Sequence, residues 1–488
     1  MGIETGTVML SIIGPAVVLV LAALGIMMTD LFVKSDAEQP FLMWIGFVGM
    51  LGALAVSASF WGKEAAYGFY GMVVADNFST FFTTLFLIAG GLTLLMSSGY
   101  VRAQGIAAGE YYTLTLFATT GMVLMAQSTD LIMLFLGLEV LSVSLYVLAG
   151  MAQDSTRSAE SSLKYFMLGA FSTGFLLYGI ALLYGACGST RLADIGSVLA
   201  QKQILREPML LAGMGLLLTG FGFKIAMAPF HMWAPDVYEG APTPITGFMS
   251  VGVKAAAFAA LLRVFAGSLA ALSPHWKELL WIGSVLTMTI GNVAALRQTN
   301  IKRMLAYSSI AHAGYILIGV VAGGTTGTGA VLYYLQVYTL MNIGAFAVVI
   351  AIEQKGEKNL NLSAYAGLGS RHLALGAAMA VFMFSLAGIP PFSGFMGKFY
   401  IFSAAVKEGY IGLTIIAVLN SLVSVYYYLR VIVLMFMQEP ESGAEEAAVF
   451  FYPALAGVLL IAIFFTVQMG LFPSSYLQLA QDSIKMFL

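Results

Sequence analysis

The sequence predicts an all-α polytopic membrane protein, with about 14 transmembrane helices when apolar windows are counted. Of its 488 residues, 60% are hydrophobic and only 9% are charged, whereas soluble domains are about 45–50% apolar and about 25% charged. A soluble fold of this length could not cover so much apolar surface, so lipid is the expected solvent for most of the chain. The first apolar run begins near Val8 and is too long for a signal peptide, so we expect a retained spanning helix.

The length of the apolar runs locates the candidate helices, because a spanning helix needs about 20 mostly apolar residues. The twelfth candidate continues past a break after residue 389. The candidate ranges are 9–30, 41–62, 77–99, 110–128, 130–151, 160–186, 208–228, 243–267, 279–297, 302–323, 327–353, 373–408, 411–437 and 449–472.

Two proline-rich stretches interrupt the helical pattern, in the seventh and twelfth candidate helices. The first contains Pro229 and Pro235, and the second contains Pro390 and Pro391. Proline lacks a backbone N–H and breaks a helix, and inside a bilayer the freed backbone groups must be satisfied by protein or water. Both breaks are therefore expected in the protein interior beside water, with a surface loop as the alternative for each.

Similar residues recur in the two halves of the chain. Gly220–Lys224 and Gly394–Lys398 both read G-F-x-x-K at an offset of 174 residues, and Glu139 and His312 occupy the middles of two helices at an offset of 173. Paired helix breaks in two halves of a chain are typical of transporters. We therefore expect two five-helix units, of which the second must be inverted because each holds an odd number of helices. The expected divisions are 1–109 (three helices), 110–267 (first unit), 268–438 (second unit) and 439–488 (last helix).

Four lysines fall within or beside the apolar helices: Lys164, Lys224, Lys254 and Lys398. A charged side chain at the centre of a bilayer costs several kcal/mol, on the order of 3 by insertion measurements, so such residues are expected to be functional. Burial lowers the pKa of a lysine and a nearby carboxylate raises it. A buried lysine can therefore take up and release protons, whereas an arginine stays charged.

Glu139, Lys164 and His312 each allow a structural as well as a functional interpretation. Glu139 lies in mid-helix and is either a proton carrier or a neutral acid held by a hydrogen bond. Lys164 opens the sixth helix, where it is either the ion partner of Glu139 or a lysine that extends to the membrane surface. His312 is either a proton relay or a neutral core histidine with both ring nitrogens bonded.

Composition and motifs exclude several other classes of function. A net charge of −2 gives no reason to expect nucleic acid. The chain has one cysteine and four histidines without metal-ligand spacing, which argues against a haem, a zinc site or an iron–sulfur cluster. No P-loop is present, so ATP is not expected as the energy source. A partner or an ion gradient must supply the energy.

The segment Phe223–Pro244 reads FKIAMAPFHMWAPDVYEGAPTP. With Glu139 inside Leu138–Ser142 and the lysine at position 398, it resembles the signature of the antiporter-like membrane subunits of respiratory complex I, the proton-pumping NADH–quinone oxidoreductase. The resemblance extends over nearly the whole chain. It implies inverted five-helix units, broken seventh and twelfth helices, and a row of titratable groups along a water-filled axis at mid-membrane.

The resemblance also implies a role for each candidate residue. Glu139 and Lys164 would form an ion pair, and Lys224 would be the gating lysine. Lys254 would be the central relay. His312 and Lys398 would lie on the connection to the second half-channel.

A complex I subunit of this kind would bind no cofactor itself and would lie in the bacterial inner membrane. FMN, iron–sulfur clusters and quinone are expected in partner subunits, and the sister antiporter-like subunit M and small membrane subunits are the expected neighbours. Three alternatives stay open: a subunit of a multisubunit sodium/proton antiporter, a subunit of an energy-converting hydrogenase, and a scaffold that moves no protons.

Overall fold

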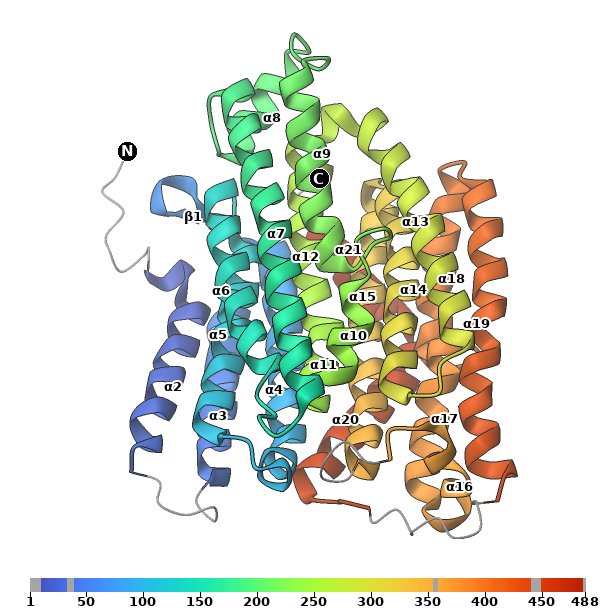
Figure 1. Ribbon diagram of the computed structural model, residues 1–488. Coiled ribbons are helices and arrows are strands. Elements are labelled where there is room, and N and C mark those ends of the chain that lie inside the picture. Colours follow the sequence, from blue (N-terminus) through green and yellow to red (C-terminus); the bar gives the residue numbers. More distant parts are fainter. Residues whose placement is uncertain (1–9, 33–38, 354–358, 440–448, 486–488) are drawn as a thin grey trace.

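The computed structural model describes residues 10–32, 39–353, 359–439 and 449–485. Its helices stand roughly side by side in one bundle, with a short antiparallel hairpin near one end formed by β1 (Ala66–Gly68) and β2 (Val73–Ala75) (Figure 1). The all-α prediction is therefore confirmed for the described residues. Short 3-10 turns connect some elements: η1 (Phe69–Gly71), η4 (Ala270–Leu272) and η5 (Leu362–Tyr365).

The helices fall in four groups along the chain. The N-terminal group is α2 (Gly14–Asp30), α3 (Gln39–Ala58) and α4 (Asn77–Gln104). The next group is α5 (Ala108–Gln127), α6 (Leu131–Ala149), α7 (Thr156–Cys187), α8 (Leu192–Ala200), α9 (Pro208–Ile225), α10 (Trp233–Gly240), α11 (Thr243–Phe248), the π-helical η2 (Met249–Val253), α12 (Lys254–Leu261) and the π-helical η3 (Leu262–Ser268). The third is α13 (Ser273–Leu296), α14 (Ile301–Ala322), α15 (Gly324–Ile352), α16 (Leu368–Arg371), α17 (Leu373–Ala387), α18 (Ser393–Lys407) and α19 (Ile411–Met437). The chain closes with α20 (Pro453–Leu471) and α21 (Pro473–Ile484).

Every candidate range from the sequence falls on one or more of these helices, with 243–267 and 373–408 divided among several. Within the described residues, 11 helices are long and apolar enough to cross a membrane, and Gly14–Asp30 and Leu373–Ala387 are apolar but shorter. The chain is therefore a multi-pass membrane protein, and the count of about 14 spans stays a prediction.

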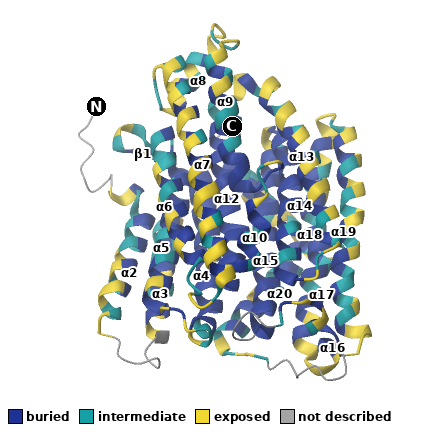
Figure 2. Ribbon diagram, in the orientation of Figure 1, coloured by how far each residue is buried: buried dark blue, intermediate teal, exposed yellow. Residues whose placement is uncertain are grey.

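The centre of the bundle is formed by a few helices that other helices surround (Figure 2). The most apolar window is 100% buried in Thr243–Ser268 and 94% buried in both Ile301–Ala322 and Gly324–Ile352, but 28% buried in Ile411–Met437. A titratable side chain on one of the first three segments is thus enclosed by protein rather than by lipid.

Both predicted helix breaks are present. α9 ends at Ile225 and α10 begins at Trp233, while α17 ends at Ala387 and α18 begins at Ser393. Protein groups satisfy the freed backbone at each break. The N–H of Ala228 donates to Thr287 Oγ1 at 2.9 Å, and at the second break the N–H of Gly394, in the first turn of α18, donates to Ser385 Oγ at 3.1 Å.

The expected interior position of the breaks is correct for Pro235, which is buried, and wrong for the other three prolines. Pro229, Pro390 and Pro391 are exposed on the outside of the bundle, whereas Ala228 and Ser393 beside them are buried. Proline has no N–H to satisfy. It can therefore face outward while the neighbouring donors find partners inside.

The G-F-x-x-K repeat does not mark equivalent positions. Gly220–Lys224 ends α9, before the first break, whereas Gly394–Lys398 begins α18, after the second break. The offset of 174 residues is therefore wrong. The two motifs share letters but sit on opposite sides of their breaks.

Matching local features instead recur at an offset of 170 residues. Asp130 caps α6 and bridges to Arg191, next to α8 at the top of Figure 1, while Asn300 caps α14 and bridges to Asn361, on the α16 side at the bottom. Gly121 lies against the backbone of Leu141 just as Gly291 lies against that of Ala311. The two bridges lie at opposite ends of the bundle, as inverted units would require, and the repeat itself stays a prediction.

Candidate functional site

Four of the predicted site residues lie in the interior of the bundle. Lys224 is 3% exposed, Lys254 1%, His312 1% and Lys398 4%. They come from α9, α12, α14 and α18. A basic side chain held this far from solvent must be compensated by polar partners or must lose its charge.

Lys224 lies in the last turn of α9 and points toward α6 and α7. Its Nζ donates to Ser142 Oγ at 2.7 Å and lies 5.6 and 5.5 Å from the ring centres of Tyr146 and Tyr165. Glu139, one turn before Ser142 on α6, interacts electrostatically with Lys224. The ammonium is thus held by a hydroxyl and two aromatic faces, with a carboxylate in range.

Lys254 begins α12 directly after the π-helical turn η2. Its Nζ donates to both the backbone oxygen and the Oγ of Ser309, each at 2.5 Å. Single π turns within helices occur frequently at functional sites. This turn lies one residue before the lysine, in a segment rich in small residues.

His312 lies at the middle of α14 with both ring nitrogens occupied. Nδ1 is 2.7 Å from the hydroxyl of Tyr334, and Nε2 is 3.0 Å from that of Tyr428. Tyr428 in turn bonds Ser308 Oγ. Because a tyrosine hydroxyl can donate or accept, this arrangement serves either tautomer of the imidazole. His312 is also within electrostatic range of both Lys254 and Lys398.

Lys398 lies in the second turn of α18. Its Nζ donates to the backbone oxygen of Ala387, the last residue of α17, and to Ser421 Oγ on α19, both at 2.9 Å. The break thus supplies the acceptor, because an interrupted helix leaves its last carbonyls without helical partners. A cavity of about 660 Å³ adjoins Lys398 between α18 and α19 and is also lined by Lys407.

The predicted ion pair between Glu139 and Lys164 is wrong. Lys164 Nζ lies 2.6 Å from Glu160 and 2.7 Å from Asp236, and its side chain is 40% exposed. Lys164 sits in the third turn of α7, where these two carboxylates are nearer than the middle of α6. Glu139 Oε1 is buried and has no hydrogen-bond partner among the described residues.

Sequence reasoning missed several charged residues at the end of the bundle where α7 begins. Asp236 also binds Arg303 at 2.7 Å, and Arg303 binds Glu239 at 3.0 Å. Lys302, 1% exposed, donates to the backbone oxygen of Ala241 at 2.6 Å. Asp236 and Glu239 are the two acidic residues of the motif Phe223–Pro244, and their charge was the sequence feature that could have indicated these ion pairs.

Lys224, Lys254, His312 and Lys398 form a row of buried basic residues. Several buried polar atoms beside this row have no hydrogen-bond partner within the described residues. Native proteins satisfy nearly all such atoms with protein or ordered water. Within the described part of the chain, no three His, Cys, Asp or Glu side chains gather as metal ligands. The unpartnered atoms near the row are Glu139 Oε1, Asn342 Oδ1 and the hydroxyls of Tyr146, Tyr165, Tyr238 and Tyr338.

Sequence relatives cover nearly the entire chain. Residues 128–424 match the family described as NADH:quinone oxidoreductase/Mrp antiporter, TM. A relative from Trichlorobacter lovleyi named NADH-quinone oxidoreductase subunit N is 52% identical over 480 residues, which is 98% of each chain. A subunit N from Chloroflexus aggregans is 45% identical over 478 residues, which is 97% of each chain.

Solved structures agree with these relatives. A chain of respiratory complex I from Thermus thermophilus with bound aureothin matches with a TM-score of 0.81 and 37% identity, covering 96% of this chain and 99% of that one. A chain of the Mrp complex from Dietzia sp. matches with a TM-score of 0.82 but 22% identity, covering 96% and 97%, which is a likeness of fold. The chain therefore belongs to the family of membrane subunits that NADH:quinone oxidoreductases and Mrp antiporters share.

Proposed function

We propose that this chain is subunit N of a bacterial NADH-quinone oxidoreductase and that it moves protons across the inner membrane. The observation that carries the proposal is the buried row Lys224, Lys254, His312 and Lys398, with His312 in electrostatic range of both its lysine neighbours. Intramembrane ionisable residues that face the interior of a bundle are typical of proton relays.

Glu139 is the group proposed to control Lys224. A carboxylate in electrostatic range stabilises the ammonium, and its neutralisation removes that stabilisation. One pKa unit is worth about 1.4 kcal/mol, and moving one charge across 100 mV costs about 2.3 kcal/mol. A change of roughly two units in the pKa of Lys224 would therefore supply about the free energy needed to move one proton against 100 mV.

Protons would pass between the buried groups through hydroxyls and water. Ser309 contacts Lys254, and the tyrosine hydroxyls on both sides of His312 can donate or accept. The unpartnered hydroxyls of Tyr146 and Tyr165, next to Lys224, are suitable sites for bound water.

Lys164 takes a different proposed role from the one the sequence suggested. Through Asp236 it connects α7 to α10 and, because Asp236 also binds Arg303, to α14. These helices belong to the two proposed five-helix units, 110–267 and 268–438. Lys164 would thus help to hold the two units together at one end of the bundle. Along the sequence, the proposed segment 1–109 precedes these units and the proposed segment 439–488 follows them.

Redox chemistry would take place outside this chain. NADH oxidation and quinone reduction are assigned to partner subunits that carry FMN, iron–sulfur clusters and quinone, with the sister subunit M and small membrane subunits as neighbours. Relatives named subunit N with up to 98% coverage support this over an antiporter or hydrogenase subunit. Co-purification with flavin and iron–sulfur subunits tests the assignment.

The direct test of proton transfer is Lys224→Ala in the purified complex reconstituted in liposomes. The variant should lose NADH-driven proton pumping, because Lys224 is the basic group that Glu139 is proposed to control. Lys277→Ala is the matched control, since Lys277 lies at the start of α13 and bonds the backbone oxygen of Ala322 at 3.3 Å. Full pumping by the Lys224 variant in an intact complex would overturn the proposal.

A further inference from the structure

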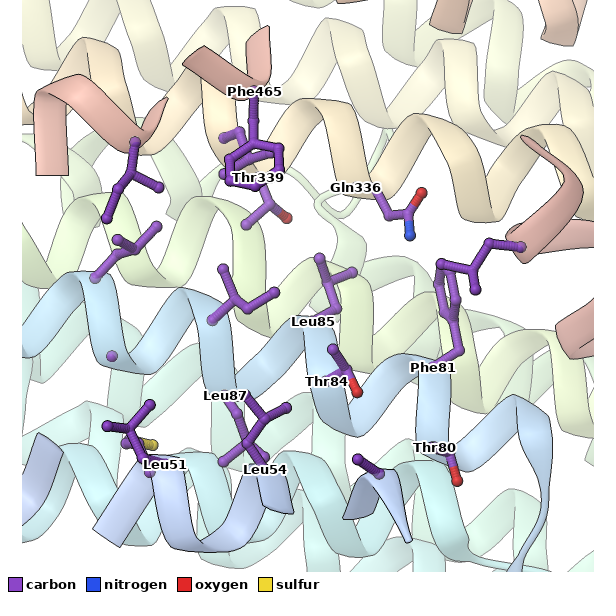
Figure 3. A pocket seen from close by; sticks show the side chains of 18 of the residues that line it. Leu51, Leu54, Thr80, Phe81, Thr84, Leu85, Leu87, Gln336, Thr339 and Phe465 are labelled. Carbon is purple, nitrogen blue, oxygen red and sulfur yellow. The ribbon is translucent and has the colours of Figure 1, made fainter. Parts of the chain in front are cut away.

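A large apolar cavity lies outside the row of basic residues, none of which lines it. It has a volume of about 640 Å³ and lies between the N-terminal helices α3 and α4 on one side and α15, α20 and α21 on the other. Figure 3 shows Leu51 and Leu54 on one wall, with Phe465 and Thr339 opposite. We propose that this cavity binds one acyl chain of a membrane phospholipid whose phosphate lies near Lys63.

The cavity has the size and elongated shape that an acyl chain needs. Its volume falls within the range of about 300–1,000 Å³ that is usual for small-molecule sites. It follows α4 from Thr80 to Leu95, about 22 Å of helix at 1.5 Å per residue.

The cavity is longer than one leaflet of a bilayer is deep. The hydrocarbon core is about 30 Å thick, so one leaflet is about 15 Å deep. A groove of about 22 Å is therefore long enough to hold a single acyl chain from one leaflet. Trp61 and Tyr476 line the cavity, and both residue types are enriched at the membrane–water interface.

A cationic group stands at the same end as Trp61. Lys63 is exposed, two residues after Trp61, with its Nζ 6.0 Å from the ring centre of Phe60. The loop that carries both is tied to α4, because the N–H of Gly62 donates to Asn77 Oδ1 at 2.8 Å. An exposed ammonium two residues from the cavity-lining Trp61 complements the phosphate of a phospholipid.

Gln336 is the residue to which a quinol, the alternative ligand for this cavity, would donate a hydrogen bond. Its carboxamide points from α15 toward the cavity (Figure 3), and Oε1 is buried without a hydrogen-bond partner among the described residues. The hydroxyl of a quinol could donate to this oxygen. A quinol carries no phosphate to use Lys63, however, and the other lining residues are mostly apolar.

The test counts the phospholipid retained by the intact complex after a fixed detergent wash, by mass spectrometry of a solvent extract. Gly91→Leu should retain one phospholipid fewer than the unaltered complex. Gly91 lines the cavity, and a Cβ there meets the Phe47 ring at 3.5 Å, an ordinary contact, so the side chain of a leucine would extend into the cavity. Gly174→Leu is the matched control, because Gly174 has nothing within 4 Å. Equal retention by all three complexes would overturn the proposal.

A second measurement keeps the proposal testable if Gly91→Leu fails to assemble. Leu54, in the cavity wall, is replaced by photoreactive benzoylphenylalanine and irradiated in the assembled complex. An adduct with the mass of a phospholipid supports the proposal, and Lys63→Gln should reduce its yield. An adduct with a quinone, another subunit or a different segment of this chain would overturn it. Neither result depends on proton pumping, so the proposed function can fail separately.

Discussion

The partners of each buried basic group explain how it can stay inside the membrane. Lys224, Lys254 and Lys398 each donate to a serine hydroxyl on another helix, and none of the three has a carboxylate within ion-pair distance in the described residues. Hydroxyls and carbonyls stabilise an ammonium but leave it free to lose its proton, because they carry no full negative charge to hold it. These partners therefore favour proton transfer by the three lysines over a permanent positive charge on them.

The sequence predicted which basic groups are buried but not what they bind. Burial could be predicted because Lys224 and Lys254 stand in long apolar runs. Their partners Ser142 and Ser309 lie 82 and 55 residues away along the chain. Such pairs depend on how the helices pack. The same limit explains the wrong partner for Lys164, whose depth could not be read from the sequence.

Ser309→Ala should slow proton pumping roughly tenfold, since a hydrogen bond to a charged group is worth about 1.5–3 kcal/mol and one of the two acceptors of Lys254 remains. Ser309→Thr keeps the hydroxyl and should restore most of the rate. The measurement is NADH-driven acidification in proteoliposomes. Equal rates for the alanine and threonine variants would show that the hydroxyl has no part in transfer.

At the scale of helices, the apolar runs predicted the positions of the helices correctly, whereas the similarity between short motifs predicted the wrong repeat offset. Each predicted range falls on a helix, and both proline breaks are present, because spanning length and proline chemistry act locally. The π turn at Met249–Val253 had no sequence signal. The repeat offset of 174 failed because short motifs can match by chance, whereas capping and close helix contacts match at 170.

Gly121 and Gly291 offer a test of this equivalence. A Cβ would lie 2.5 Å from the backbone nitrogen of Leu141 at the first position and 2.6 Å from that of Ala311 at the second. Gly121→Ala and Gly291→Ala should each destabilise the protein by about 1–3 kcal/mol through overpacking. Gly215→Ala, where nothing lies within 4 Å, should be neutral or stabilising. Thermal unfolding in detergent measures all three. A large difference between the first two variants would argue against equivalent positions.

For the whole molecule, the proposed function depends on an uneven distribution of burial. The helices that carry Lys254 and His312 are almost completely enclosed, whereas outer helices such as α19 expose broad apolar faces. Composition alone predicted a membrane protein, and the motif of Phe223–Pro244 indicated the family. Neither could reveal the cavity at α3 and α4, because cavities arise from the packing of segments that are distant in the sequence.

The most direct measurement compares proton pumping by the reconstituted complex with Lys254→Arg and Lys254→Met. Arginine keeps the positive charge but does not release its proton, whereas methionine removes the charge. If Lys254 transfers protons, both variants should lose pumping to a similar extent while the complex stays assembled. Pumping at the unaltered rate by Lys254→Arg would show that a fixed charge is sufficient, and the central claim of proton exchange at the buried amines would be contradicted.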